Sequence, residues 1–125
     1  MTYIATLVRV FATGMWSRML IAHMGHPWIA ETLVLIRKHQ HFYTDISALY
    51  YRPWQFYNAL VLAMEYGVLD RLLFGTDYPF TTAQDSINGL RHANDVTGQS
   101  GLPQVTEQTI EGLLARDAFA LLGLS

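Results

Sequence analysis

The chain has 125 residues, of which 51% are hydrophobic and 14% are charged, whereas an average soluble domain has about 25% charged residues. A formal net charge of −2 provides no basic surface, so nucleic acid is not expected as a partner. The sequence has no cysteine, which excludes disulfides, thiolate nucleophiles and cysteine-based zinc sites. The high apolar fraction indicates strands buried on both faces, or an apolar surface that another chain covers.

The chain has no internal boundary, since no low-complexity tract or linker rich in proline or glycine divides it. We therefore predict a single domain over residues 1–125. The apolar N-terminal segment lacks a preceding basic region and is interrupted by Arg9, which is not the pattern of a signal peptide. No stretch reaches the roughly 18 apolar residues that span a bilayer, so we expect a soluble, cytoplasmic protein without a membrane partner.

Three short apolar runs that end in polar residues alternate with segments of helical pattern. The apolar runs are RMLIAHMGHP at 18–27, HFYTDISA at 41–48 and RLLFGTDYP at 71–79. The helical segments that follow them cover residues 28–39, 53–67 and 82–98. Strands that alternate with helices of this length are typical of βαβ units, so the pattern predicts a parallel sheet in an α/β fold.

Helix-boundary residues support this division. Pro53 suits the first turn of the second helical segment and Gly67 suits the position after its end. Two further helices are predicted to flank the three units, over residues 3–12 and 107–123. For the last of these, Thr106 can accept the first hydrogen bonds and Gly123 marks the end.

Polar side chains cluster where the predicted strands end. His23 and His26 follow the first strand, Asp45 and Ser47 the second, and Asp77 the third. In parallel α/β folds, ligands bind at the carboxyl ends of the strands, where the loops to the helices lie. We therefore expect these side chains to share one rim of the sheet.

Each of these residues also has a purely structural interpretation. Asp77 lies in the turn-forming sequence GTDYP, and His23 on an apolar strand can be a core histidine that donates to a carbonyl. Asp45 and Ser47 can cap the next helix. Arg52 stands beside two tyrosines, where it can stack on an aromatic ring or meet a carboxylate substrate.

Four segments, LIAHMGHPW, FYTDIS, LLFGTDYPF and LLARDAFALLGL, occur in an order and spacing that resemble a known family. Over roughly residues 15–124, the chain resembles the C-terminal part of the amidohydrolase-related (amidohydrolase 2) metal-dependent hydrolases. These include decarboxylases related to aminocarboxymuconate semialdehyde decarboxylase and γ-resorcylate decarboxylase. The resemblance implies the C-terminal part of a (β/α)₈ TIM barrel, with strands six to eight and their helices.

The resemblance also implies roles for the strand-end residues. His23 resembles the family's active-site histidine on strand six, and Asp77 resembles the strand-eight acid that binds the metal and handles a proton. The implied cofactor is a divalent metal, zinc or alternatively manganese. A small carboxylated or cyclic substrate would lie against His26, Tyr78 and Arg52, while strand seven, FYTDIS, would contribute shape rather than ligands.

The match is to part of a barrel, since a complete one takes about 250 residues. The family's HxH on strand one and its histidine on strand five have no counterpart in position. The HQH at 39–41 precedes a strand, so it is predicted on the opposite face from the rim. Two function classes follow. One is a metal-dependent hydrolase or non-oxidative decarboxylase, inactive as this chain alone. The other is a non-catalytic half-barrel that forms a homo-oligomer or pairs with a complementary barrel half.

Overall fold

The computed structural model describes residues 18–98 and 100–123, so the helix predicted over residues 3–12 lies outside the described part of the chain. Within this part, three short strands form one sheet in the order β1-β2-β3. The strands are β1 (Met19–Ile21), β2 (Phe42–Asp45) and β3 (Leu72–Leu73). Both neighbouring pairs are parallel, which confirms the predicted α/β fold with a parallel sheet.

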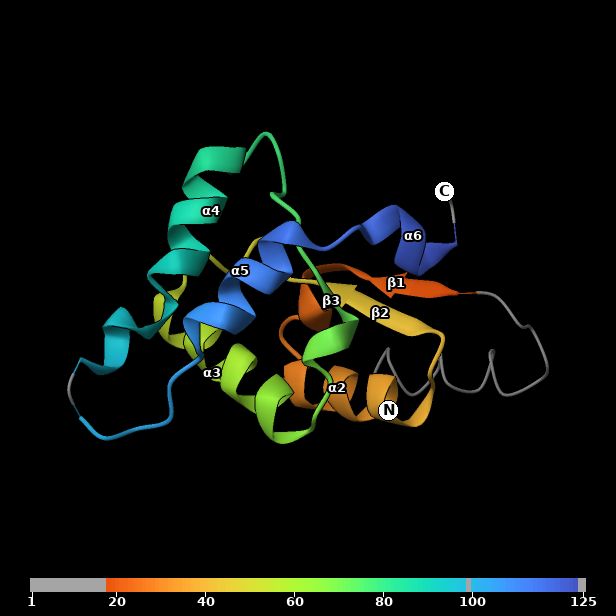
Figure 1. The fold of residues 1–125 in the computed structure, drawn as a ribbon, viewed down its shortest axis with the longest axis horizontal. Helices are drawn as coiled ribbons and strands as arrows, with labels where there is room; N and C mark the ends of the chain where they lie inside the picture. Colours follow the sequence, from red (N-terminus) through yellow and green to blue (C-terminus); the bar gives the residue numbers. More distant parts are fainter. Residues whose placement is uncertain (1–17, 99, 124–125) are drawn as a thin grey trace.

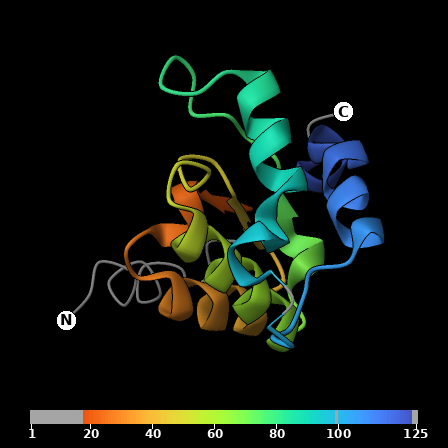
Figure 2. The same ribbon diagram turned by 90° about the vertical axis from the view of Figure 1, so that its left-hand side faces the viewer.

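Helices connect the strands, as the sequence pattern predicts. A 3₁₀ turn, η1 (Ala22–Gly25), and helix α2 (Ile29–Lys38) follow β1, and helix α3 (Pro53–Glu65) and the 3₁₀ turn η2 (Leu69–Arg71) follow β2. Beyond β3 come α4 (Ala83–Arg91), η3 (Ala93–Thr97), α5 (Glu107–Ala115) and α6 (Ala118–Leu122). Helices α2 and α3 pack against each other on one side of the sheet, and α4 packs against α5 (Figures 1 and 2). Among the described residues, no helix is long and apolar enough to cross a membrane.

Several predicted helix ends are confirmed. Pro53 occupies the first turn of α3, and Gly67 follows its end with a φ of 69°, a left-handed conformation that glycine adopts without a steric penalty. Thr106 accepts a hydrogen bond from the Thr109 N–H at the start of α5. Gly123 ends α6 in the left-handed conformation.

The single helix predicted over residues 82–98 is wrong. The α-helix ends at Arg91, and a separate 3₁₀ turn covers Ala93–Thr97. Asn94 donates its side-chain N–H to Val105 O and accepts from Val105 N. Such side-chain bonds to the backbone compete with helical hydrogen bonding, so the helical pattern does not continue as one α-helix.

The single helix predicted over residues 107–123 is also wrong, because an extended Arg116 separates α5 from α6. Asp117 accepts from Ala120 N and thereby begins a new helix. The Arg116 guanidinium donates to the carbonyl oxygens of Leu69 and Leu72. The sequence pattern is helical on both sides of the break, and the tertiary bonds of Arg116 accompany the interruption.

The hydrophobic core fills the space between the sheet and the helices. Its fully buried side chains come from β3, from all the longer helices and from the turns and loops between them; they include Leu33, Ile36, Leu60, Leu72, Leu90 and Leu113. The buried Thr44 hydroxyl donates to Ile21 O across the sheet, so the hydroxyl is paired, as buried polar groups normally are.

The amino ends of the strands form the edge opposite the predicted rim. There, the Arg71 guanidinium donates to the carbonyl oxygens of Ile36, His39 and Phe42. The HQH sequence lies between the end of α2 and the start of β2, at this edge, as the sequence pattern predicts. This edge therefore carries contacts that join helix ends to strands.

Candidate functional site

The carboxyl ends of the three strands bring His23, Asp45 and Asp77 together. His23 lies in η1 directly after β1, Asp45 is the last residue of β2, and Asp77 follows β3 by four positions. His23 Nε2 lies 3.8 Å from Asp77 Oδ1, which is too long for a direct hydrogen bond. It is a separation that an oxygen of a water or substrate can bridge. The His23 side chain is 40% exposed and that of Asp77 24%, so solvent reaches both.

The backbone at the site adopts conformations that are uncommon outside glycine. His23, Met24 and Asp77 have φ values of 57°, 53° and 60°, in the left-handed region. Residues in this region cost free energy and persist only where surrounding contacts hold them, often at functional sites. The contact that holds His23 is the bond from its backbone N–H to Asp45 Oδ1, at 3.1 Å.

Asp45 and Ser47 do not cap a helix, so that interpretation is wrong. Helix α3 begins at Pro53, and its N-cap residue, Arg52, makes no side-chain capping bond. Asp45 Oδ1 instead accepts from His23 N, from Ser47 N at 3.0 Å and from the Ser47 hydroxyl. The Ser47 hydroxyl in turn lies 2.7 Å from His23 Nδ1. The strand that the resemblance expects to contribute shape rather than ligands, β2, also contacts the site histidine through the residues at its end.

A second layer of contacts supports the loop that carries Asp77. The Tyr50 hydroxyl donates to Gly75 O at 2.6 Å, and burial raises the pKa of Tyr50, with the nearby Asp45 carboxylate raising it further. Tyr50 therefore stays a neutral donor at neutral pH. A Cβ at Gly75 would lie 3.4 Å from Ser47 Cβ and 3.6 Å from Asp45 Cβ, which are ordinary van der Waals distances, so Gly75 packs directly beside Asp45 and Ser47. The sequence contained Tyr50 and Gly75 but no pattern that linked them.

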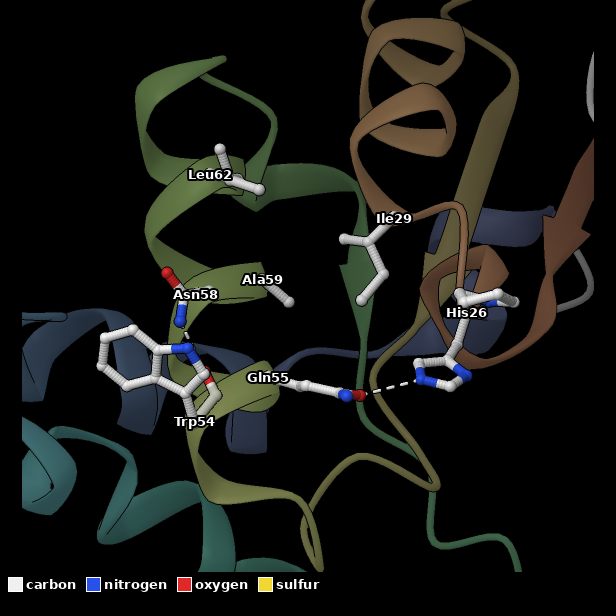
Figure 3. Close-up of a pocket in the computed structure, with 8 residues that line it drawn as sticks. His26, Ile29, Trp54, Gln55, Asn58, Ala59 and Leu62 are labelled. Carbon is white, nitrogen blue, oxygen red and sulfur yellow. Dashed lines mark hydrogen bonds between the residues drawn. The ribbon is translucent and has the colours of Figure 1, made fainter.

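His26 lines a groove beside α3. His26 Nε2 lies 2.8 Å from Gln55 Oε1, and Figure 3 shows Gln55 extending from α3 toward His26. The groove has a volume of about 300 Å³ and is lined mainly by apolar side chains, among them Ile29, Trp54 and Leu62.

The structure also places Tyr78 and Arg52, the other two residues expected to contact the substrate. Tyr78 is 79% exposed. The Arg52 guanidinium donates to Ala48 O and lies 4.8 Å from the centre of the Tyr51 ring. The Tyr51 hydroxyl lies 3.5 Å from Asp77 Oδ2, beside the pair. The substrate-contacting roles expected of His26, Tyr78 and Arg52 stay predictions.

Comparison with protein families decides the family of this chain. The model of the amidohydrolase family matches residues 2–124. The chain belongs to the amidohydrolase family. No curated protein and no solved structure gives a significant match to it. The three parallel strands and their helices form part of the TIM barrel of an amidohydrolase.

Amidohydrolases typically bind divalent metal ions, so the side chains of this chain that could ligate a metal can be compared with the ligand set that a metal site needs. His23 Nε2 and Asp77 Oδ1 face each other, whereas tight sites use three or four protein ligands. Within residues 18–98 and 100–123, no group of three or more histidine, aspartate or glutamate side chains is placed to hold a metal ion. The described residues therefore supply at most part of a metal site.

Proposed function

We propose that this amidohydrolase contributes His23 and Asp77 to the active site of a metal-dependent hydrolase or non-oxidative decarboxylase. The observation that carries the proposal is the position of His23 Nε2, 3.8 Å from Asp77 Oδ1 across two strand ends, in a chain of this family. A histidine and a carboxylate at this separation can share a proton with an oxygen bound between them.

The side chains divide the chemistry as follows. His23 Nε2 orients the substrate, or protonates it when the imidazole carries a second proton, and Asp77 accepts a proton from water or substrate. The Tyr51 hydroxyl, 3.5 Å from Asp77 Oδ2, orients the carboxylate. The proposed substrate is a small carboxylated or cyclic molecule, as in the decarboxylases that the sequence resembles.

The remaining metal ligands must come from outside the described residues, because these contain no group of three or more histidine, aspartate or glutamate side chains placed to hold a metal ion. We propose that a second copy of this chain or a complementary barrel half supplies them. β1 and β3 are the edge strands of the described sheet, and edge strands readily pair with another chain. Large apolar side chains are exposed as well; they include Leu20, Tyr51, Trp54, Tyr78 and Phe80.

A second candidate function is a non-catalytic half-barrel that binds a partner. The same sheet edges and exposed apolar side chains favour it. The two candidates differ in metal content, since a half-barrel without catalysis needs no metal.

The first experiment measures metal per chain by plasma mass spectrometry, on protein purified without chelators. The variant is Asp77→Asn, because asparagine tolerates the left-handed backbone found at this position and loses the charge. Asp95→Asn, at an exposed aspartate on η3, is the matched control. Near-stoichiometric zinc or manganese in the wild type and in Asp95→Asn, but not in Asp77→Asn, supports the enzyme. Metal-free wild type, at every oligomeric state found by light scattering, refutes a metal site completed by a second copy of this chain and favours the half-barrel.

A further inference from the structure

The hydrogen bonds between Asp45, Ser47 and His23 determine where protons lie. Asp45 Oδ1 accepts from two backbone N–H groups, those of His23 and Ser47, so this oxygen is an acceptor. The Ser47 hydroxyl also contacts Oδ1 and donates its single proton to it. The Ser47 oxygen therefore has no proton left for the imidazole and can act toward His23 only as an acceptor.

The imidazole must then donate to Ser47. His23 Nδ1 lies 2.7 Å from the Ser47 oxygen, and a hydrogen bond at this distance requires a proton between the two atoms. A neutral imidazole carries one N–H, so with that proton on Nδ1, Nε2 holds a lone pair. Nε2 is the atom that faces Asp77.

We infer that Asp45 and Ser47 are positioning residues that hold the neutral His23 ring in its Nδ1–H tautomer, with the Nε2 lone pair facing Asp77. Two acceptors, Nε2 and Asp77 Oδ1, then face each other at 3.8 Å. Such a pair attracts a proton donor, which is a water or a substrate hydroxyl, or a cation. In the opposite tautomer, Nε2–H would point at Asp77, and the pair would present one donor and one acceptor.

The same two residues hold the imidazole in place as well as its proton. Asp45 holds the left-handed backbone of His23 in place by accepting a hydrogen bond from the His23 N–H. The side chain of Asp45 is only 17% exposed. Ser47 is 4% exposed, so solvent does not readily replace its hydroxyl. The catalytic importance of the tautomer rests on the proposed function, but the tautomer itself depends only on these contacts.

The test is the tautomer of His23, read from long-range proton–nitrogen NMR correlations of protein labelled at histidine nitrogen. Spectra are recorded on chelator-treated protein at a pH of about 8.5, where histidine side chains are ordinarily neutral. His23→Asn assigns the signals. We expect the Nδ1–H form in the wild type and a smaller share of it in Ser47→Ala, because the nearest acceptors are then Asp45 Oδ1, 3.8 Å from Nδ1, and Asp77 Oδ1, 3.8 Å from Nε2.

Two further variants separate positioning from general packing. Ser47→Thr keeps the hydroxyl and should keep the Nδ1–H form. Ser86→Ala removes another buried serine hydroxyl, one that donates to Thr82 O in α4, and should leave His23 unchanged. An Nε2–H form in the wild type overturns the inference without any variant, even if Ser47→Ala does not fold. An unchanged tautomer in folded Ser47→Ala overturns it also.

The outcome is independent of the test of the proposed function. Metal-free protein with His23 in the Nδ1–H form would refute a metal site completed by a second copy of this chain and leave the positioning role standing. Metal-bound protein whose chelator-treated form has His23 in the Nε2–H form would support the enzyme and refute the positioning role.

Discussion

Asp45→Ala should destabilise the protein more than any other single change at the strand ends. The substitution leaves three donors without their acceptor: the backbone N–H groups of His23 and Ser47, and the Ser47 hydroxyl. A typical intramolecular hydrogen bond contributes about 1 kcal/mol net, so the three together give about 3 kcal/mol. The Asp45 side chain is 17% exposed, so water replaces these bonds only in part.

The left-handed backbone of His23 makes the expected loss of stability smaller than about 3 kcal/mol. A non-glycine residue in this region costs about 1–2 kcal/mol, and without Asp45 the backbone at His23 is free to relax. That relaxation offsets part of the loss, so we expect the free energy of unfolding to fall by about 2–3 kcal/mol. Asp45→Asn keeps an acceptor oxygen and loses only the charge, so its loss should be about 1 kcal/mol.

The assay is urea unfolding followed by circular dichroism, with the slope against urea checked for constancy between variants. Asp95→Ala, at an exposed aspartate, is the control and should change the free energy of unfolding by less than about 0.5 kcal/mol. If Asp45→Ala costs no more than this control, the three bonds to Oδ1 do not hold the strand ends together and the reasoning is refuted.

Three further predictions concern packing and pH. Gly89→Ala should cost about 1–3 kcal/mol of stability, because the new Cβ would lie 2.9 Å from Tyr50 Cβ. Gly112→Ala, with no atom within 4 Å of the new Cβ, should stabilise α5 by up to about 1 kcal/mol; thermal unfolding of both variants checks the contrast, and equal effects would contradict it. Burial raises the pKa of Tyr50, so the folded chain keeps a proton that the unfolded chain releases, and stability should fall as pH rises above about 10. The stability of Tyr50→Phe should fall less steeply with pH, and parallel curves of stability against pH for the two proteins would show that Tyr50 does not cause the slope. The side-chain hydrogen bond from Arg91 lowers the pKa of Glu111, so this pair should stabilise the fold at neutral pH and lose its effect as the pH falls below about 4.5. Stability curves of wild type and Glu111→Gln should converge in acid, and a constant difference between them would argue against the ion pair.

The sequence by itself determined the elements and their order. Apolar runs predicted the three strands, and Pro53 and Gly67 predicted the bounds of α3, because proline and glycine restrict or permit backbone angles locally. The rule that parallel strands end at one edge then placed His23 and Asp77 on the same rim. The helical breaks at His92 and Arg116 were missed, since the bonds that accompany them join residues distant in the chain.

Only the tertiary structure decided how the strand-end residues act on one another. Asp45 and Ser47 have the side chains of a helix cap, and local pattern alone favoured that interpretation. They bind His23 instead, because strand pairing places Thr44 opposite Ile21 and so brings the end of β2 beside η1. Tyr50 reaches Gly75 for a similar reason, across the neighbouring strand end. A hydrogen bond needs two groups within about 3 Å, and for residues more than twenty positions apart that distance is fixed by the packing of the chain, which no local pattern contains.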